Sequence, residues 1–191
     1  MDVIDELLAN NRAFADSVTQ RPTAPRRGSR LRRGGVRPTP PAQQRALDIR
    51  PSRGLAVVTC MDSRLNVFEA LGLSEGQAHV LRNAGGVITD DVIRSLAISQ
   101  RRLGTRAVML IHHTDCGMQT LTDDGFRAEL REATGLSPSF AIESFSDLDA
   151  DVRQSLLRVR RSSFVAHRDL VRGFVYDVGT HRLREVHADG A

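Results

Sequence analysis

The chain has 191 residues with a hydrophobic fraction of 40%, which suits one domain with appendages and a sizeable buried core. Its apolar runs are too short to cross a membrane, and its acidic start lacks the apolar core of a signal peptide, so we expect a cytoplasmic protein. The net charge is +4, and in a reducing compartment the two cysteines are better suited to bind a metal than to form a disulfide.

Residues 2–18 are predicted to form an amphipathic helix. Acidic side chains in its first turn, Asp2 and Asp5, favour the helix dipole. Four apolar residues fall near one face at helical spacing: Val3, Leu7, Leu8 and Phe14. Residues 1–18 are therefore predicted to be an N-terminal helical arm.

The next segment carries the positive charge. Residues 20–53 contain ten arginines and one acid, Asp48, which gives this segment a charge of +9 and leaves −5 for the rest of the chain. Proline and glycine are frequent here and apolar periodicity is absent, so we predict a disordered linker over residues 19–53. Clustered arginines attract phosphates, so nucleic acid is one candidate partner. A solvated insertion without a partner is favoured, because no aromatic residue is available to stack on bases.

Residues 54–191 are predicted to form a catalytic α/β domain. The pattern predicts strands at 55–60, 78–82 and 106–112, helices near 65–72, 89–103, 123–134 and 146–161, and one or two closing strands between 170 and 186. Continuous apolar strands that alternate with helices indicate a mostly parallel central sheet flanked by helices, with an extra strand at the C-terminus.

Both cysteines lie in short motifs that follow predicted strands. Residues 60–64 (CMDSR) come at the end of the first strand, and residues 113–117 (HTDCG) come at the end of the third. Because ligands collect at the carboxyl edge of a parallel sheet, the two motifs are expected to meet there if these strands are neighbours. Their side chains offer two thiols, an imidazole and a carboxylate, which suit a tetrahedral zinc site: Cys60, Cys116, His113 and Asp62. The alternative is that the cysteines are small buried hydrophobic residues.

Asp62 has two candidate roles. Its carboxylate could occupy the fourth position on the metal, or it could pair with Arg64, whose planar guanidinium suits a bidentate carboxylate. Exchange between the two would form a pH gate. Two thiolates donate more charge to zinc than imidazoles do, so a bound water should be less acidic than the pKa of about 7 found with three histidines. Activity is therefore expected to rise above neutral pH.

Nearby polar residues are harder to assign. His112, at the end of a buried strand, is expected to pack, and His79 is expected to be structural. Arg82 and Asn83 end the second strand, where they could support Asp62, bind an anion or cap a turn.

Three motifs in this order, CxDxR at 60–64, RNAGG at 82–86 and HxxCG at 113–117, resemble those of the β-class carbonic anhydrases, and most closely the short prokaryotic members. The resemblance is strong over residues 54–120. It implies a zinc lyase that reversibly hydrates CO2 to bicarbonate and a proton, using hydroxide generated at the metal. It also implies a homodimer or a dimer of dimers, in which the N-terminal helix embraces the partner subunit.

The same resemblance implies one zinc ion per chain, with Cys60, His113 and Cys116 as ligands and Asp62 and Arg64 beside the metal. The arginine-rich segment departs from the usual family pattern. The chain has no tryptophan and one tyrosine, so a bicarbonate-effector site of the aromatic-rich members is not expected.

Other functions remain candidates. Related hydrolases of COS or CS2 share this zinc constellation, and a non-catalytic zinc protein could act on nucleic acid through residues 20–53. A phosphatase loop would need an arginine at position 66, where the chain has asparagine, and the glycine motif lacks the GxGxxG spacing of a nucleotide site.

Overall fold

The computed structural model describes residues 2–19, 43–44 and 46–188. Its helices are α1 (Val3–Thr19), α3 (Val67–Leu71), α4 (Asp90–Leu103), α5 (Asp123–Thr134) and α6 (Leu148–Arg161), with short 3₁₀ turns η1 (Ala84–Gly86) and η2 (Gly117–Thr120). Its strands are β1 (Leu55–Cys60), β2 (Ala78–Asn83), β3 (Ala107–His113), β4 (Val171–Tyr176) and β5 (Leu183–Val186). Within the described ranges, no helix has the length and apolar character needed to span a membrane.

The five strands form one sheet in the order β2-β1-β3-β4-β5. The first four are parallel to their neighbours, and β5 runs antiparallel to β4 at one edge. The α/β class with a mostly parallel sheet and an extra C-terminal strand, predicted from the sequence, is confirmed. The helix expected near 65–72 begins later, because the Asn66 side chain accepts a hydrogen bond from the Glu69 N–H and caps the helix start.

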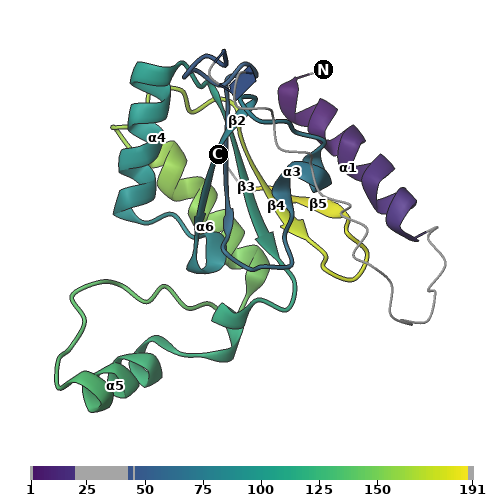
Figure 1. Ribbon diagram of the computed structural model, residues 1–191. Helices are drawn as coiled ribbons and strands as arrows, with labels where there is room; N and C mark the ends of the chain where they lie inside the picture. The colour runs from purple at the N-terminus through teal and green to yellow at the C-terminus, as the bar shows by residue number, and fades with distance from the viewer. Residues whose placement is uncertain (1, 20–42, 45, 189–191) are drawn as a thin grey trace.

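Helices cover both faces of the sheet, as Figure 1 shows. Side chains alternate along each strand, so neighbouring residues enter different cores. Val57 and Met109 pack on the side of α1 and α3, whereas Val58 and Leu110 pack on the side of α4 and α6. Every residue of the two central strands β1 and β3 is buried. These two strands therefore give the carboxyl edge of the sheet a rigid support.

Helix α1 lies against the sheet of its own chain. Ile4 and Leu7 are fully buried in the core on that side. The Arg172 guanidinium on β4 also fixes the helix start, because it lies 2.7 Å from Asp5 and 2.7 Å from Glu185 of β5. The contacts described here join the helix to its own sheet, and its embrace of a partner subunit, which the resemblance implies, stays a prediction.

A buried asparagine, Asn11, connects α1 to two distant segments. Its amide donates to the carbonyls of Ala70 (3.2 Å) and His181 (2.9 Å), and its side-chain oxygen accepts from the N–H of Leu183 (2.9 Å). Asn11→Ala should lower the free energy of unfolding by about 1–3 kcal/mol, because these three backbone groups would lose a buried partner. Denaturant unfolding would measure the change.

The neighbouring Asn10→Ala is the matched control, since Asn10 makes one 3.1 Å hydrogen bond, to the Leu71 carbonyl. Its expected cost is about 1 kcal/mol or less. Equal losses for the two variants would contradict a special role for Asn11.

Part of the predicted linker packs on the domain. The backbone N–H of Ser52 donates to the Gly76 carbonyl (2.9 Å), and that of Arg53 donates to the Gln77 carbonyl (3.1 Å). The Arg53 guanidinium also pairs with Glu6 of α1 at 2.8 Å. Residues 20–42 lie outside the described residues, so disorder and nucleic-acid binding in this segment stay predictions.

Candidate metal centre

The two cysteine motifs meet at the carboxyl edge of the sheet. Strands β1 and β3 pair in parallel, from Leu55 opposite Ala107 to Thr59 opposite Ile111. Cys60 therefore ends one strand beside the end of the other, where His113 lies. The sequence predicted this meeting on the condition that the two strands were neighbours, and that condition holds.

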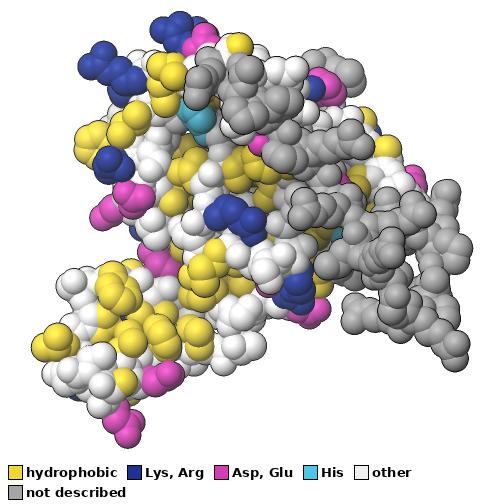
Figure 2. Space-filling model, in the orientation of Figure 1, with side chains coloured by type: hydrophobic (Ala, Val, Ile, Leu, Met, Phe, Trp, Pro, Cys, Tyr) yellow, Lys and Arg dark blue, Asp and Glu magenta, His cyan; other side chains and the backbone are white. Residues whose placement is uncertain are grey.

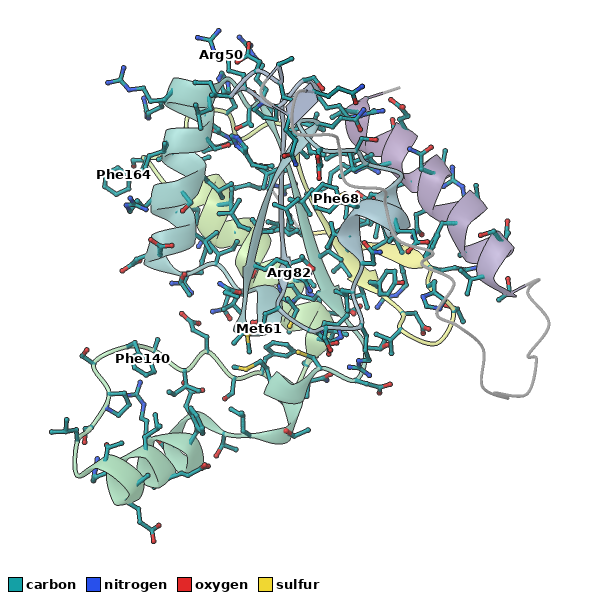
Figure 3. The ribbon with its side chains drawn as sticks, viewed as in Figure 1. Arg50, Met61, Phe68, Arg82, Phe140 and Phe164 are labelled. Atoms are coloured by element: carbon teal, nitrogen blue, oxygen red, sulfur yellow. The ribbon has the colours of Figure 1, made fainter. Side chains whose placement is uncertain are left out.

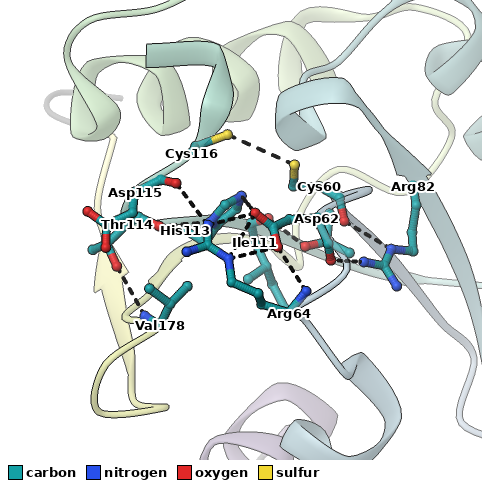
Figure 4. Close-up of polar contacts among 11 residues, drawn as sticks. Cys60, Asp62, Arg64, Arg82, Ile111, His113, Thr114, Asp115, Cys116 and Val178 are labelled. Atoms are coloured by element: carbon teal, nitrogen blue, oxygen red, sulfur yellow. Dashed lines mark hydrogen bonds and ion pairs between the residues drawn. The ribbon is translucent and has the colours of Figure 1, made fainter. Parts of the chain in front are cut away.

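Three potential ligands converge there. The ligand atoms of Cys60, His113 and Cys116 all lie within 4.8 Å of one another, and all three residues are buried. The two sulfurs are 3.9 Å apart (Figure 4). Tetrahedral zinc with Zn–S bonds of about 2.3 Å would separate two sulfurs by about 3.8 Å, so the spacing of the thiols suits this metal.

The imidazole of His113 is oriented for binding. Its Nδ1 lies 2.8 Å from the Thr114 carbonyl oxygen, to which it can donate. Its Nε2 is buried and has no hydrogen-bond partner among the described residues. A buried nitrogen lone pair without a partner is costly unless a metal or another group takes it. The donor set therefore fits zinc.

A turn brings Cys116 back toward His113. Asp115 lies between them with φ of 55°, in the left-handed region that few residues adopt. Hydrogen bonds to the end of β4 fix the turn: the Thr114 N–H donates to the Tyr176 carbonyl (3.0 Å), and the Val178 N–H donates to the Thr114 hydroxyl (3.0 Å). These hydrogen bonds give the second motif a defined shape.

The two thiols form a hydrogen bond in which either sulfur can donate. The pKa of Cys60 is lowered to about 4, chiefly by its hydrogen bond with Cys116, although burial opposes this shift. The His113 imidazole and the backbone at Asp62 and Gly85 lower the pKa of Cys60 further. The pKa of Cys116 is raised, first by the same hydrogen bond and then by burial. The hydrogen bond between the sulfurs thus favours the ionised form of one thiol and opposes that of the other, and a metal would bind both as thiolates.

Asp62 lies beside these three residues and is clamped by Arg64. The Arg64 guanidinium donates to both carboxylate oxygens, with Nε 3.0 Å from Oδ1 and Nη2 2.7 Å from Oδ2. This clamp holds the pKa of Asp62 well below its usual range. The same Nη2 donates to the Asp115 carbonyl at 2.9 Å, so Arg64 connects the two motifs.

Of the two roles considered for Asp62, the structure has the Arg64 pair. Asp62 Oδ2 lies 3.7 Å from His113 Nε2, close to the three converging ligand atoms. This is near enough for the carboxylate to contact a molecule bound between them.

Arg82 and Asn83 support the first motif. The Arg82 guanidinium donates to the carbonyls of Cys60 (2.9 Å) and Asp62 (2.6 Å), and the Asn83 amide donates to the Val87 carbonyl (2.9 Å). Of the roles considered from the sequence, Arg82 therefore supports the backbone around Asp62, and Asn83 closes a turn.

The two other histidines considered from the sequence pack elsewhere. His112 is fully buried, with its Nδ1 3.1 Å from the Asp151 carboxylate of α6. Neither ring nitrogen of His112 makes a well-oriented hydrogen bond among the described residues. His79 contacts the Ser99 hydroxyl of α4 at 2.7 Å.

Gly86 lies in the RNAGG motif at 82–86 but was given no role of its own from the sequence. Gly86, with φ of +74°, passes so close to β1 that a Cβ there would lie 2.8 Å from the backbone N of Cys60 and 2.8 Å from the carbonyl carbon of Thr59. The signal was the glycine pair directly after a strand, which is typical of a close backbone approach.

An apolar cavity of about 380 Å³ adjoins the centre. Met61 and Met118, each close to a ligand cysteine in the sequence, line this cavity together with Phe126 and Phe140. Figure 3 labels Met61 and Phe140. Phe126 lies on α5, and Phe140 lies on the segment that joins α5 to α6, residues 135–147. Figure 2 shows hydrophobic side chains gathered on the surface of this region. Small uncharged molecules would suit this cavity.

Comparisons with known proteins agree with this geometry. The family model described as carbonic anhydrase matches residues 55–147. β-Carbonic anhydrase 1 of Mycobacterium tuberculosis is 47% identical over 97% of this chain and 99% of its own length. Carbon disulfide hydrolase of Saccharolobus solfataricus is 33% identical over 71% of this chain and 78% of its own length.

Among solved structures, the carbonic anhydrase of Streptococcus mutans superposes with a TM-score of 0.70 at 37% identity, covering 98% of this chain and 99% of that chain.

Proposed function

Because the chain belongs to the β-carbonic anhydrase family, we propose that it catalyses the reversible hydration of CO2 to bicarbonate and a proton. The observation that carries the proposal is the convergence of Cys60, His113 and Cys116 at the sheet edge. These three residues would hold one zinc ion per chain. When bound, zinc acts as a Lewis acid that makes water a nucleophile near neutral pH.

Asp62 and Arg64 would orient the reactants. Arg64 keeps Asp62 ionised and fixes its Oδ2 near the metal position. A carboxylate with so low a pKa is a weak base, so Oδ2 would accept a hydrogen bond from the attacking water without removing its proton. CO2 would contact the apolar side chains of Met61 and Met118 in the adjoining cavity, since it is uncharged and needs no polar partner there.

The direct test is stopped-flow CO2 hydration combined with metal analysis of the purified full-length protein. We expect one zinc per chain and a turnover that rises with pH above neutrality. Zinc binding without CO2 hydration would contradict the proposed reaction and support a structural metal site.

The role of Asp62 leads to a specific prediction. Asp62→Asn should lower kcat/KM by about a hundredfold, because one preoriented polar group contacts the reacting water. It should also move the pH midpoint of activity downward, because the carboxylate that could close the fourth metal position at low pH is gone. Steady-state rates over a pH series would measure both effects.

Asp124→Asn, on the exposed face of α5, is the matched control and should leave the profile unchanged. If Asp62→Asn kept the wild-type pH midpoint of activity, the hypothesis that Asp62 closes the fourth metal position at low pH would be wrong.

A second candidate reaction is the hydrolysis of CS2 or COS at the same site. The apolar cavity favours these uncharged substrates too, and carbon disulfide hydrolases are among the relatives. Hydrogen sulfide release from CS2, compared with CO2 hydration on one preparation, would distinguish the two activities.

We also propose that the protein is cytoplasmic and assembles as a homodimer or a dimer of dimers. Exposed apolar side chains on the segment between α5 and α6 support assembly, since Leu136 is 72% and Phe140 is 60% exposed. Light scattering during size-exclusion chromatography would give the oligomeric state.

A further inference from the structure

Helix α6 has a basic face on the side opposite its core contacts. Its buried residues, among them Val152 and Leu156, pack against the sheet. Three arginines and three other residues of the helix line an open hollow of about 560 Å³: Arg153, Arg158, Arg161, Ala150, Gln154 and Leu157. With 3.6 residues per turn, these six positions lie within about 140° of one another around the helix axis. The three guanidinium groups therefore border one hollow, which we call the basic face of α6.

Two of these arginines have no internal partner among the described residues. The guanidinium groups of Arg153 and Arg161 form no hydrogen bond or ion pair with the part of the chain that the structure describes. The nearby carboxylate of Asp149 is bound by Arg184 of β5, at 2.6 Å. Guanidinium groups bind phosphate through parallel N–H···O bonds, so a small anion that carries a phosphate group suits this face.

The third arginine is shared with the cavity beside the metal centre. Arg158 Nη1 lies 2.7 Å from the Glu143 carboxylate, and the two side chains are 36% and 20% exposed. Glu143 also lines the apolar cavity that adjoins the metal centre, together with Met61 and Met118. One ion pair therefore connects the basic face of α6 to the wall of that cavity.

Glu143 has a backbone conformation that its neighbours must hold in place. Its φ of 59° lies in the left-handed region, which is costly for a residue with a side chain. On one side, the N–H of Ser144 donates to the Asp123 carboxylate of α5 at 2.8 Å. On the other side, Arg158 binds the Glu143 carboxylate. Loss of the second contact should let Glu143 relax and shift the adjacent Ile142, which lines the same cavity.

We propose that the basic face of α6 binds a small phosphate-bearing anion, which competes with Glu143 for Arg158 and so alters the wall of the cavity beside the metal centre. The anion binds Arg153, Arg158 and Arg161 together, and the Glu143 carboxylate loses its partner. The cavity wall then loosens, which lowers the rate of reaction at the centre. The anion site does not depend on the proposed function, whereas its effect on turnover rests on it.

The first test is phosphate binding. Inorganic phosphate would be titrated by calorimetry into the zinc-loaded full-length protein and into Arg153→Gln, Arg161→Gln and Arg102→Gln. Each of the first two variants removes one guanidinium group from the hollow and should weaken binding about tenfold. Arg102 is exposed on α4 outside the hollow, so its variant should match the wild type. Equal affinities in all four proteins would overturn the site, since phosphate bound at the metal itself would survive these changes.

Glu143→Gln tests the coupling between the two sites. It weakens the competing ion pair and leaves all three arginines in place, so phosphate should bind about two- to fivefold more tightly. Hydrogen exchange of residues 140–146, measured by mass spectrometry, would report the state of the cavity wall. Phosphate should speed this exchange in the wild type and leave it unchanged in Glu143→Gln, which should exchange faster from the start. The coupling would be refuted if phosphate bound the wild type without changing its exchange, or bound Glu143→Gln no more tightly.

Two further measurements identify the ligand and separate this proposal from the reaction. Glycerol phosphate would be titrated beside inorganic phosphate: tighter binding of the ester indicates a phosphorylated small molecule, and weaker binding indicates free phosphate. The saturating anion should slow CO2 hydration by the wild type to a plateau above zero, and an unaffected rate would refute the effect on turnover. Zinc-bound wild type that lacks CO2 hydration would refute the proposed reaction alone, since binding and exchange use no CO2.

Discussion

Cys116→Ser is expected to weaken zinc binding by about 10²–10³-fold and to reduce CO2 hydration to background. A structural zinc site of four ligands gives about 10–16 kcal/mol, so each ligand accounts for about 2.5–4 kcal/mol, and every 1.4 kcal/mol is a factor of ten. A serine hydroxyl does not ionise near neutral pH and cannot replace the thiolate. Zinc content after dialysis and stopped-flow rates would measure the two losses.

The matched control is Thr120→Ser in the turn that follows Cys116. The Thr120 hydroxyl is exposed and donates to the Gly117 carbonyl, and serine keeps this group. The control should retain one zinc per chain. If Cys116→Ser bound zinc as tightly as the control does, Cys116 would not be a ligand.

Gly86→Ala should damage the centre without touching a ligand side chain. The added Cβ would lie 2.8 Å from backbone atoms of Thr59 and Cys60, which cannot rotate away. Cys60 must shift, so we expect zinc content to fall well below one per chain. The free energy of unfolding should fall by about 2 kcal/mol or more, because the site is overpacked and because alanine is strained in the left-handed region of backbone conformation.

Gly135→Ala separates these two causes. Gly135 has the same φ of +74°, but a Cβ there meets nothing within 4 Å. It should cost about 1–2 kcal/mol from backbone strain alone and keep full zinc content. Equal zinc contents in the two alanine variants would show that the approach of Gly86 to Cys60 is not tight.

Much of the site was predictable because its residues follow strands. The apolar runs fixed the positions of β1 and β3, and the parallel arrangement then required Cys60 and His113 to share an edge. Residue types and spacing within each motif indicated the metal. The fold class followed from the same alternation of strands and helices.

The remaining features depend on contacts between distant segments. The sequence left Asp62 with two roles, because only the placement of the Arg64 guanidinium against both carboxylate oxygens distinguishes them. Phe145 packs on Gly85 across 60 positions of chain, and no local pattern indicates such a contact. The buried hydrogen bonds of Asn11 join α1 to segments that lie far along the chain, for the same reason.

The complete burial of β1 and β3 bears on the order of folding and metal binding. Both strands reach their core through apolar contacts that need no ion, unlike small zinc fingers, which unfold when the metal is lost. The polypeptide can therefore finish folding first and acquire its ion afterwards. Scarcity of zinc should leave a pool of intact, inactive protein that regains activity when zinc returns, without new synthesis.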